Sequence, residues 1–246
     1  MSALREGRVH EVSVEARTVI VEGADVPVVH ARPDGMPRAG IVLHPDIGGL
    51  RPLFDDLARR LATHGFAVCV TEPFARFDRS ALVSVDDRMA RVPELDDETQ
   101  LADLDAAANL LVVADDVAHV SVLGFCIGGY YTFKAAASGR FDRAVAFYGM
   151  LRTPSQWHGP GHRDPLDVVA DVCPTLAIFG SADTWTPEAD VEALRAAWRE
   201  RRDCEVVVVD GAGHGFVHDP DRPAHRADDA AACWVRALEF VSPSSG

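Results

Sequence analysis

The sequence lacks the features of a nucleic-acid-binding or membrane protein. It contains only one lysine, Lys134, and its 38 acidic residues exceed its 24 basic ones, which gives a formal net charge of −14. Nucleic acids and anionic membrane surfaces are bound through concentrated positive charge, so we expect neither as a partner. No apolar run reaches the roughly 18 residues of a membrane span, and residues 1–7 lack the apolar core of a signal peptide.

Disulfide and metal-site patterns are also missing. The chain has five cysteines, an odd number, and no two of them have C-x-x-C spacing. This disfavours a disulfide scaffold or a zinc knuckle, and we expect a reducing, cytoplasmic location. The histidine pairs His158/His162 and His214/His218 have i, i+4 spacing. The glycines around them disfavour a shared helix face, so we expect no metal and no other cofactor.

Strand and helix patterns alternate along most of the chain, which predicts a single α/β domain spanning residues 1–246. Strand-length apolar runs lie at residues 39–43, 66–70, 119–123, 143–148, 175–179 and 206–209. Helical patterns lie at residues 52–64, 99–113, from 127 onward, from Pro187 onward with Thr186 as the expected N-cap, and at 224–241. This order indicates a mostly parallel central sheet with helices on both faces.

The two ends of the predicted sheet differ in character. Residues 12–20 and 26–31 alternate around a turn at Glu22-Gly23, which predicts an antiparallel N-terminal hairpin at the sheet edge. Residues 71–98 and 151–172 are polar or rich in proline and glycine, and we expect irregular structure there. In this architecture residues 71–98 would lie over the carboxyl edge of the sheet and help to shape a pocket.

The turn after residues 119–123 has the pattern of a nucleophile elbow. Residues 124–128, GFCIG, have the form G-x-C-x-G, with cysteine in place of the usual serine. Strand and helix pass close at such a turn, so the positions two residues either side of Cys126 must be small. The N-terminus of the following helix favours a thiolate at Cys126 and an oxyanion beside it. The alternative is a small buried cysteine in a tight turn.

An acid and a histidine follow Cys126 in the order that the elbow architecture requires, namely nucleophile, acid, histidine. Asp183 comes shortly after the apolar run 175–179, and His214 comes shortly after the run 206–209. Ligands of an open α/β sheet bind beyond the carboxyl ends of its strands, so we expect both side chains near Cys126. The alternatives are a turn-forming aspartate and an ordinary loop histidine.

Six motifs together make the chain resemble the dienelactone hydrolase family, a cysteine branch of the α/β-hydrolases, over nearly its whole length. They are HPDIGG (44–49), TEPFAR (71–76), GFCIGG (124–129), YG (148–149), GSAD (180–183) and GHGF (213–216). The resemblance implies the α/β-hydrolase fold and hydrolysis of an ester or lactone, such as a dienelactone-like enol-lactone or a related small carboxylic ester. It implies Cys126 as nucleophile, His214 as base and Asp183 as the acid that orients the histidine, with an acyl-enzyme intermediate.

The resemblance also implies an oxyanion hole formed by the backbone N–H groups of Ile47 and Ile127. The position of Asp46 is usually a glutamate in the family, where it contacts the nucleophile and helps to deprotonate it. Aspartate is one methylene shorter, so Asp46 is either a nucleophile-activating acid or a turn former ahead of two glycines.

The substrate pocket is the least specified part of the predicted site. The family's dienelactone enzymes bind the substrate carboxylate with arginines, one of them four residues after the catalytic histidine, where this chain has His218. The candidate pocket residues are Arg76, Arg91, Tyr148, Trp185, Phe216 and His218, with Arg79 and Arg88 as further arginines of the irregular segment.

Two other classes of function are open from the sequence. One is a non-hydrolytic member of the fold that only binds a small molecule, and the other is a thiol-redox protein acting through Cys126. No second cysteine lies near Cys126 in the sequence, which weighs against the redox function. The expected partner is a small-molecule ester or lactone, and both a monomer and a homodimer are open.

Overall fold

One eight-stranded sheet forms the centre of the structure. The computed structural model describes residues 1–243, and its strands follow the spatial order β1-β2-β4-β3-β5-β6-β7-β8. The strands are β1 (Val12–Val21), β2 (Ala24–Pro33), β3 (Ala39–His44), β4 (Phe66–Thr71), β5 (Val120–Phe125), β6 (Arg143–Phe147), β7 (Thr175–Gly180) and β8 (Glu205–Val209). The β1–β2 and β2–β4 pairs are antiparallel, and the other neighbouring pairs are parallel. The predicted mostly parallel sheet with an antiparallel N-terminal hairpin is confirmed.

The hairpin turns at the predicted pair of residues. Glu22 and Gly23 have φ angles of 52° and 82°, and two consecutive positive φ angles suit the two-residue turn whose twist matches the flanking strands. The hairpin forms one edge of the sheet, with β1 outermost. The predicted nucleophile strand, β5, lies near the centre of the sheet between β3 and β6.

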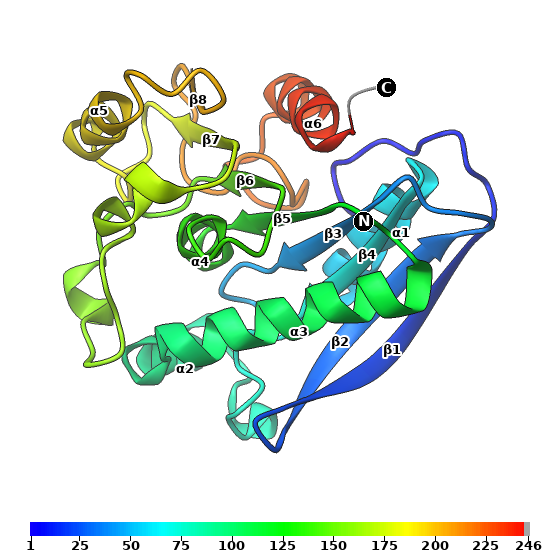
Figure 1. Cartoon of the computed structure of the whole chain (residues 1–246). Coiled ribbons are helices and arrows are strands. Elements are labelled where there is room, and N and C mark those ends of the chain that lie inside the picture. The colour runs from blue at the N-terminus through cyan, green and yellow to red at the C-terminus, as the bar shows by residue number, and fades with distance from the viewer. Residues whose placement is uncertain (244–246) are drawn as a thin grey trace.

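Helices cover both faces of the sheet. They are α1 (Pro52–Thr63), α2 (Val85–Arg91), α3 (Asp97–Asp115), α4 (Ile127–Ala136), α5 (Glu188–Ala197) and α6 (Ala227–Val241). The sheet separates α1 and α6 from α3 and α4 (Figure 1). Every residue of β3, β4, β5 and β7 is buried, as expected for parallel strands covered on both faces. Within residues 1–243, none of the helices combines the length and the apolar character needed to cross a bilayer.

The helix boundaries differ from the prediction where capping decides them. α3 begins at Asp97 instead of residue 99, because the side chain of Asp96 accepts a hydrogen bond from the N–H of Thr99 at 3.0 Å. The polar segment 71–98 contains α2, whose start is fixed by a reciprocal capping box between Ser84 and Asp87. Short-range polar contacts therefore produce helix where the apolar pattern is weak.

The C-terminal helices start later than predicted. α5 begins at Glu188 with Pro187 at its N-cap, and the side chain of Thr186 does not cap it. α6 begins at Ala227 rather than residue 224. Residues 151–172, which were expected to be irregular, contain three short 3-10 turns, at Ser155–Trp157, Pro165–Asp167 and Val169–Asp171.

Two glycines let three segments meet at the centre of the sheet. A Cβ atom on Gly124 would lie 2.2 Å from the carbonyl oxygen of Gly128. A Cβ atom on Gly128 would lie 2.1 Å from the carbonyl oxygen of His44 and 2.4 Å from that of Pro45. Both clashes are with backbone, which cannot rotate away. The turn after β5, the start of α4 and the loop after β3 therefore approach one another only because these positions lack side chains.

We predict that Gly128→Ala destabilises the protein by about 1–3 kcal/mol, the usual cost of overpacking. Alanine is the better helix former by up to about 1 kcal/mol, but the clash with two backbone carbonyls outweighs this gain. Urea unfolding would measure the change. Gly213→Ala is the matched control, because a Cβ there meets nothing within 4 Å. Equal stability of the Gly128→Ala protein and the wild type would contradict the steric account.

Candidate active site

Cys126 lies at the apex of the turn between β5 and α4, where the elbow pattern places it. Its φ of 57° and ψ of −117° lie in a region that residues other than glycine rarely adopt. Such a conformation costs on the order of 1–3 kcal/mol and persists only where the surroundings enforce it. The N–H of Cys126 donates to the carbonyl oxygen of Phe147 at 3.1 Å, which fixes the turn against β6. Its side chain is nearly buried, at 9% exposed.

His214 follows β8, and Asp183 follows β7 and holds its ring. The Nδ1 of His214 donates to Oδ2 of Asp183 at 2.8 Å, and the N–H of Trp185 donates to Oδ1 of the same carboxylate at 2.9 Å. Asp183 is 5% exposed, so this carboxylate is largely removed from solvent. The other ring nitrogen, Nε2, is buried and has no hydrogen-bond partner of good geometry within residues 1–243. The hydrogen bond at Nδ1 therefore fixes the ring of His214, while Nε2 is left available for another partner.

The pKa of His214 reflects the proximity of the Cys126 thiol. Burial lowers this pKa, but the negative charge of Cys126 and the hydrogen bond with Asp183 raise it more, so that the pKa is raised to about 10. The arrangement therefore favours a protonated His214 beside the sulfur of Cys126, and a neighbouring imidazolium is a feature that activates a cysteine nucleophile. Asp183 also fixes the tautomer of the ring, with the proton on Nδ1.

Two backbone N–H groups near the apex are without backbone partners. Ile127 is the first residue of α4, so its N–H has no acceptor in its own helix. Ile47 lies in the loop after β3, within the turn closed by the hydrogen bond from Gly49 N–H to the carbonyl of Asp46 at 2.9 Å. Neither N–H donates to a backbone carbonyl in the described part of the chain. The close approach at Gly128 brings these two segments together.

Asp46 is fully buried, and its two carboxylate oxygens are each bound by two donors. Oδ1 accepts from Gly48 N–H at 2.9 Å and from Nη1 of Arg51 at 2.5 Å, and Oδ2 accepts from Nη2 of Arg51 at 3.0 Å and from Nε2 of His218 at 2.8 Å. Burial raises the pKa of Asp46, but the hydrogen bonds and charges of His218 and Arg51 lower it more, to well below its usual range. No hydrogen bond joins Asp46 to Cys126 within residues 1–243, so the arrangement does not support a nucleophile-activating acid.

Three of the predicted pocket residues lie beneath the site. Tyr148, Phe216 and His218 are each 0% exposed, so as placed they cannot touch a substrate. Tyr148 packs edge-on against the ring of His214 with centroids 5.1 Å apart, and Phe216 packs against Tyr148 at 5.8 Å. The expectation that these residues line the pocket is thereby corrected, because aromatic packing between β6 and the loop after β8 encloses them.

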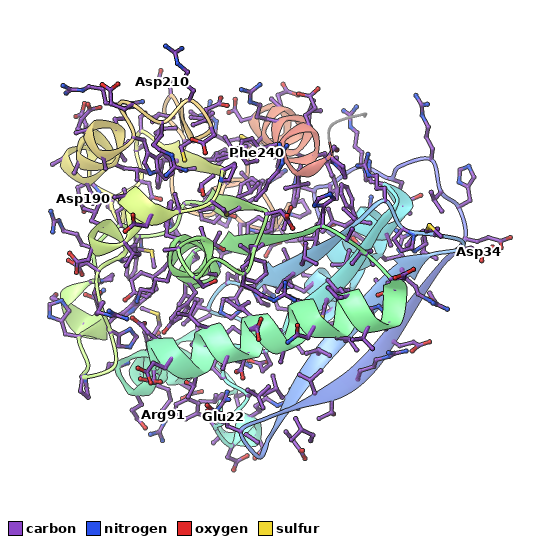
Figure 2. The ribbon with its side chains drawn as sticks, viewed as in Figure 1. Glu22, Asp34, Arg91, Asp190, Asp210 and Phe240 are labelled. Carbon is purple, nitrogen blue, oxygen red and sulfur yellow. The ribbon has the colours of Figure 1, made fainter. Side chains whose placement is uncertain are left out.

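The other predicted pocket residues lie in two places. The ring of Trp185 is 6.0 Å from that of His214 and lines a hollow of about 340 Å³ with Arg152. Arg76, which pairs with Asp103, and Arg91 line a different hollow of about 440 Å³. Arg91 lies at the outer edge of the molecule (Figure 2). Trp185 therefore lies beside the predicted catalytic residues, whereas the two arginines open onto another part of the surface.

A cleft of about 440 Å³ opens directly beside Ile47. Its lining includes apolar side chains such as Leu82, Val83 and Val85. It also includes three arginines and two aspartates: Arg51, Arg88, Arg222, Asp46 and Asp219. Arg88 was among the arginines considered from the sequence, but Arg51 and Arg222 were missed. No local signal identifies them, because the cleft joins the loop after β3, the region of α2 and the loop after β8.

The three arginines differ in how strongly the protein's own carboxylates hold them. Arg51 makes a two-point contact with Asp46. Arg88 Nη1 is 3.5 Å from Oε1 of Glu72, and Arg222 is no closer than 3.5 Å to an oxygen of Asp46 or Asp219. The guanidinium groups of Arg88 and Arg222 are therefore the less firmly held, and they remain available to an anion in the cleft.

The chain is similar to known proteins over nearly its whole length. The model of the family described as "Dienelactone hydrolase family" matches residues 26–245. The protein of Escherichia coli O157:H7 named "Putative carboxymethylenebutenolidase" is 33% identical over 239 residues, covering 92% of this chain and 85% of the relative. "Carboxymethylenebutenolidase 2" of Cupriavidus pinatubonensis is 30% identical over 214 residues, covering 85% of each chain.

A solved structure shows the same fold. The protein of Klebsiella pneumoniae subsp. pneumoniae described as a "Putative Dienelactone Hydrolase" superposes with a TM-score of 0.85 at 28% identity. The match covers 94% of this chain and 99% of that one. Sequence and structure comparisons therefore point to the same family across nearly the whole chain.

The coupling between His214 and Cys126 predicts a pH titration. His214 should stay protonated until the pH rises through about 10, because the thiolate holds the proton on the ring. In Cys126→Ala this charge is absent while burial remains, so the pKa of His214 should fall. NMR of the His214 Cε1–H resonance would measure both proteins. An unchanged titration of His214 in Cys126→Ala would show that the ring does not sense the sulfur.

Proposed function

The chain belongs to the dienelactone hydrolase family and is a hydrolase of esters or lactones, and we propose that it works through a Cys126–His214–Asp183 triad. The observation that carries the proposal is the arrangement around Cys126. The residue is held at a strained apex, and the charge of its thiol raises the pKa of a histidine whose far side is fixed by a buried aspartate. This is the constellation that nucleophilic catalysis requires.

In the proposed reaction the Cys126 thiolate attacks the carbonyl carbon of the substrate. The charge that develops on the carbonyl oxygen is stabilised by the N–H groups of Ile47 and Ile127. The C–O bond then breaks, and His214 donates its proton to the leaving oxygen, which produces a thioester on Cys126. A water molecule gives a proton to His214 and attacks the thioester, which releases the acid and regenerates the thiolate.

The chemistry of sulfur favours activated substrates. A thiolate leaves a tetrahedral intermediate more readily than an ordinary alkoxide, so esters of simple alcohols tend to revert to the starting ester. An enolate leaving group, as in an enol-lactone, is stabilised and departs in the forward direction. We infer that the substrates are small lactones or esters with a good leaving group.

The cleft beside Ile47 supports a substrate that also carries a negative charge. Its apolar residues suit a hydrocarbon portion, and Arg88 and Arg222 suit a carboxylate. These arginines take the place of the arginine that the sequence lacks at His218. A dienelactone carries both features, and so do related small carboxylic esters with a free acid group.

We predict that Cys126→Ala and His214→Ala each reduce turnover by at least about 10³-fold, because the triad acts as a unit. The substrates would be a dienelactone, p-nitrophenyl acetate and a short acyl thioester. The matched control is Cys204→Ala, which removes a half-buried thiol just before β8. Turnover retained by Cys126→Ala would refute the proposal. No turnover by wild type, together with Cys126 inert to iodoacetamide at neutral pH, would favour a binding protein.

Substrate charge gives a second prediction. Arg88→Gln and Arg222→Gln should each raise KM for the anionic dienelactone by about 10- to 100-fold, as expected for the loss of a charge-assisted contact worth about 1.5–3 kcal/mol. KM for neutral p-nitrophenyl acetate should change little. Arg17→Gln, on the exposed strand β1, controls for a general effect of net charge. Equal changes of KM for both substrates would argue against a carboxylate subsite.

A further inference from the structure

A buried chain of hydrogen bonds runs beneath the catalytic residues to the loop that carries Ile47. The hydroxyl of Tyr148 bonds to Nδ1 of His218, Nε2 of His218 bonds to Oδ2 of Asp46 at 2.8 Å, and Oδ1 of Asp46 bonds to the N–H of Gly48 at 2.9 Å. We propose that His218 is a positioning residue, which holds Asp46 and thereby sets the direction of the Ile47 N–H in the oxyanion hole. This inference rests on the proposed function.

The direction of each hydrogen bond follows from the charges of the groups. Asp46 is ionised, because the hydrogen bonds and charges of His218 and Arg51 outweigh its burial, and it can only accept. Nε2 of His218 therefore carries a proton and donates it. Burial lowers the pKa of His218, so its ring is neutral and Nδ1 has no proton. Tyr148 is the donor to Nδ1, and burial keeps its hydroxyl protonated by raising its pKa.

Aromatic packing holds the ring of His218 in place, so its single N–H donor, at Nε2, has a fixed direction. It stacks on Phe125 with centroids 4.6 Å apart and an interplanar angle of 24°, and on Phe54 at 5.8 Å and 29°. Phe125 immediately precedes Cys126, and Phe54 lies in α1. A neutral imidazole with both nitrogens bonded and its ring packed against two aromatic rings has one orientation and one tautomer. Because His218 packs on Phe125 at the end of β5, its hydrogen bond fixes the position of the Asp46 carboxylate.

Asp46 transmits this constraint to the oxyanion loop through two contacts on either side of Ile47. Its side chain accepts from Gly48 N–H, and its backbone carbonyl accepts from Gly49 N–H at 2.9 Å. Together they form a tight turn in which Ile47 is the second residue. The peptide plane that contains the Ile47 N–H also contains the carbonyl of Asp46, so the hydrogen bonds of Asp46 set its tilt. Donor direction matters because stabilisation of an oxyanion depends on preorganised geometry.

A second buried histidine–aspartate pair shows what a purely structural pair looks like in this protein. Nε2 of His30, in β2, bonds to Oδ2 of Asp115 at the end of α3, at 2.7 Å, and both side chains are buried. The distance and burial match those of the His218–Asp46 pair. His30 lies near the hairpin edge of the sheet, separated from β5 by β4 and β3. It provides a matched control for the loss of a buried hydrogen bond.

The test compares two amides at position 218. The amide nitrogen of glutamine reaches the position of Nε2, so His218→Gln keeps the donor to Asp46. Asparagine reaches only the position of Nδ1, so His218→Asn loses that donor. We expect kcat for p-nitrophenyl acetate to fall about 10- to 100-fold in His218→Asn, somewhat less than the roughly 10²–10³-fold loss on deleting an oxyanion donor. KM should change little, and His218→Gln should recover most of kcat.

Alkylation of Cys126 separates the oxyanion hole from the nucleophile. Iodoacetamide reacts with the thiolate without forming an oxyanion, so its rate should be the same in wild type, His218→Asn and His218→Gln. His30→Asn should lose a similar free energy of unfolding and keep kcat. If His218→Asn does not fold, Asp46→Asn breaks the same link from the other side and should lower kcat with the same unchanged alkylation.

Three results would overturn the inference. The first is a kcat for His218→Asn equal to that of the wild type. The second is an equal decrease of kcat in His218→Asn and His218→Gln. The third is a rate of Cys126 alkylation that falls together with kcat. The last result would mean that His218 acts through the nucleophile. Failure of the proposed function itself is distinguishable, because it appears as turnover that survives Cys126→Ala.

Discussion

The close approach of backbone segments at Gly124 and Gly128 is the constraint on which the site depends. The start of α4 lies against the carbonyl groups at the end of β3, and no side chain fits between them. This contact holds Cys126 above the carboxyl edge of the sheet in a strained backbone conformation. It also places the first free N–H of α4 beside the loop of Ile47. The proposed nucleophile and both proposed oxyanion donors thus come from one packing contact. The parallel strands β7 and β8 add the proposed acid and histidine from the same edge of the sheet.

The site contains two aspartate–histidine pairs, one partly buried and one fully buried, and their surroundings give the two histidines opposite properties. The hydrogen bond lengths are the same, 2.8 Å in each pair. His214 faces the sulfur of Cys126, and although burial lowers the pKa of His214, the interactions with Cys126 and Asp183 raise it to about 10. Burial lowers the pKa of His218, and the nearby Arg222 and Arg51 add to the effect, so this ring stays neutral. His214 is therefore readily protonated, whereas His218 stays neutral in a single tautomer.

Local patterns were sufficient to predict most of the elements, and they singled out Cys126, Asp183 and His214, which form the proposed triad. The alternation of β1 and β2, the apolar strands and the G-x-C-x-G turn are determined within a few residues, so the sequence expresses them directly. Helix starts were less accurate, because capping by Asp96 and Ser84 depends on single side chains. The pocket was the weakest prediction. Arg51 and Arg222 reach the same cleft from loops far apart in the chain, and burial of Tyr148 and Phe216 depends on packing that no short pattern encodes.

The central claim, that hydrolysis proceeds through a thioester on Cys126, can be tested by intact-protein mass spectrometry. The protein would be mixed with p-nitrophenyl acetate and quenched in acid during turnover, followed by peptide mapping. The account predicts that an acetyl group appears on the peptide containing Cys126 and disappears as substrate is consumed. The other four cysteines should remain unmodified on this timescale. Steady turnover with no acyl group on Cys126, in an assay able to detect a chemically acetylated standard, would contradict the account.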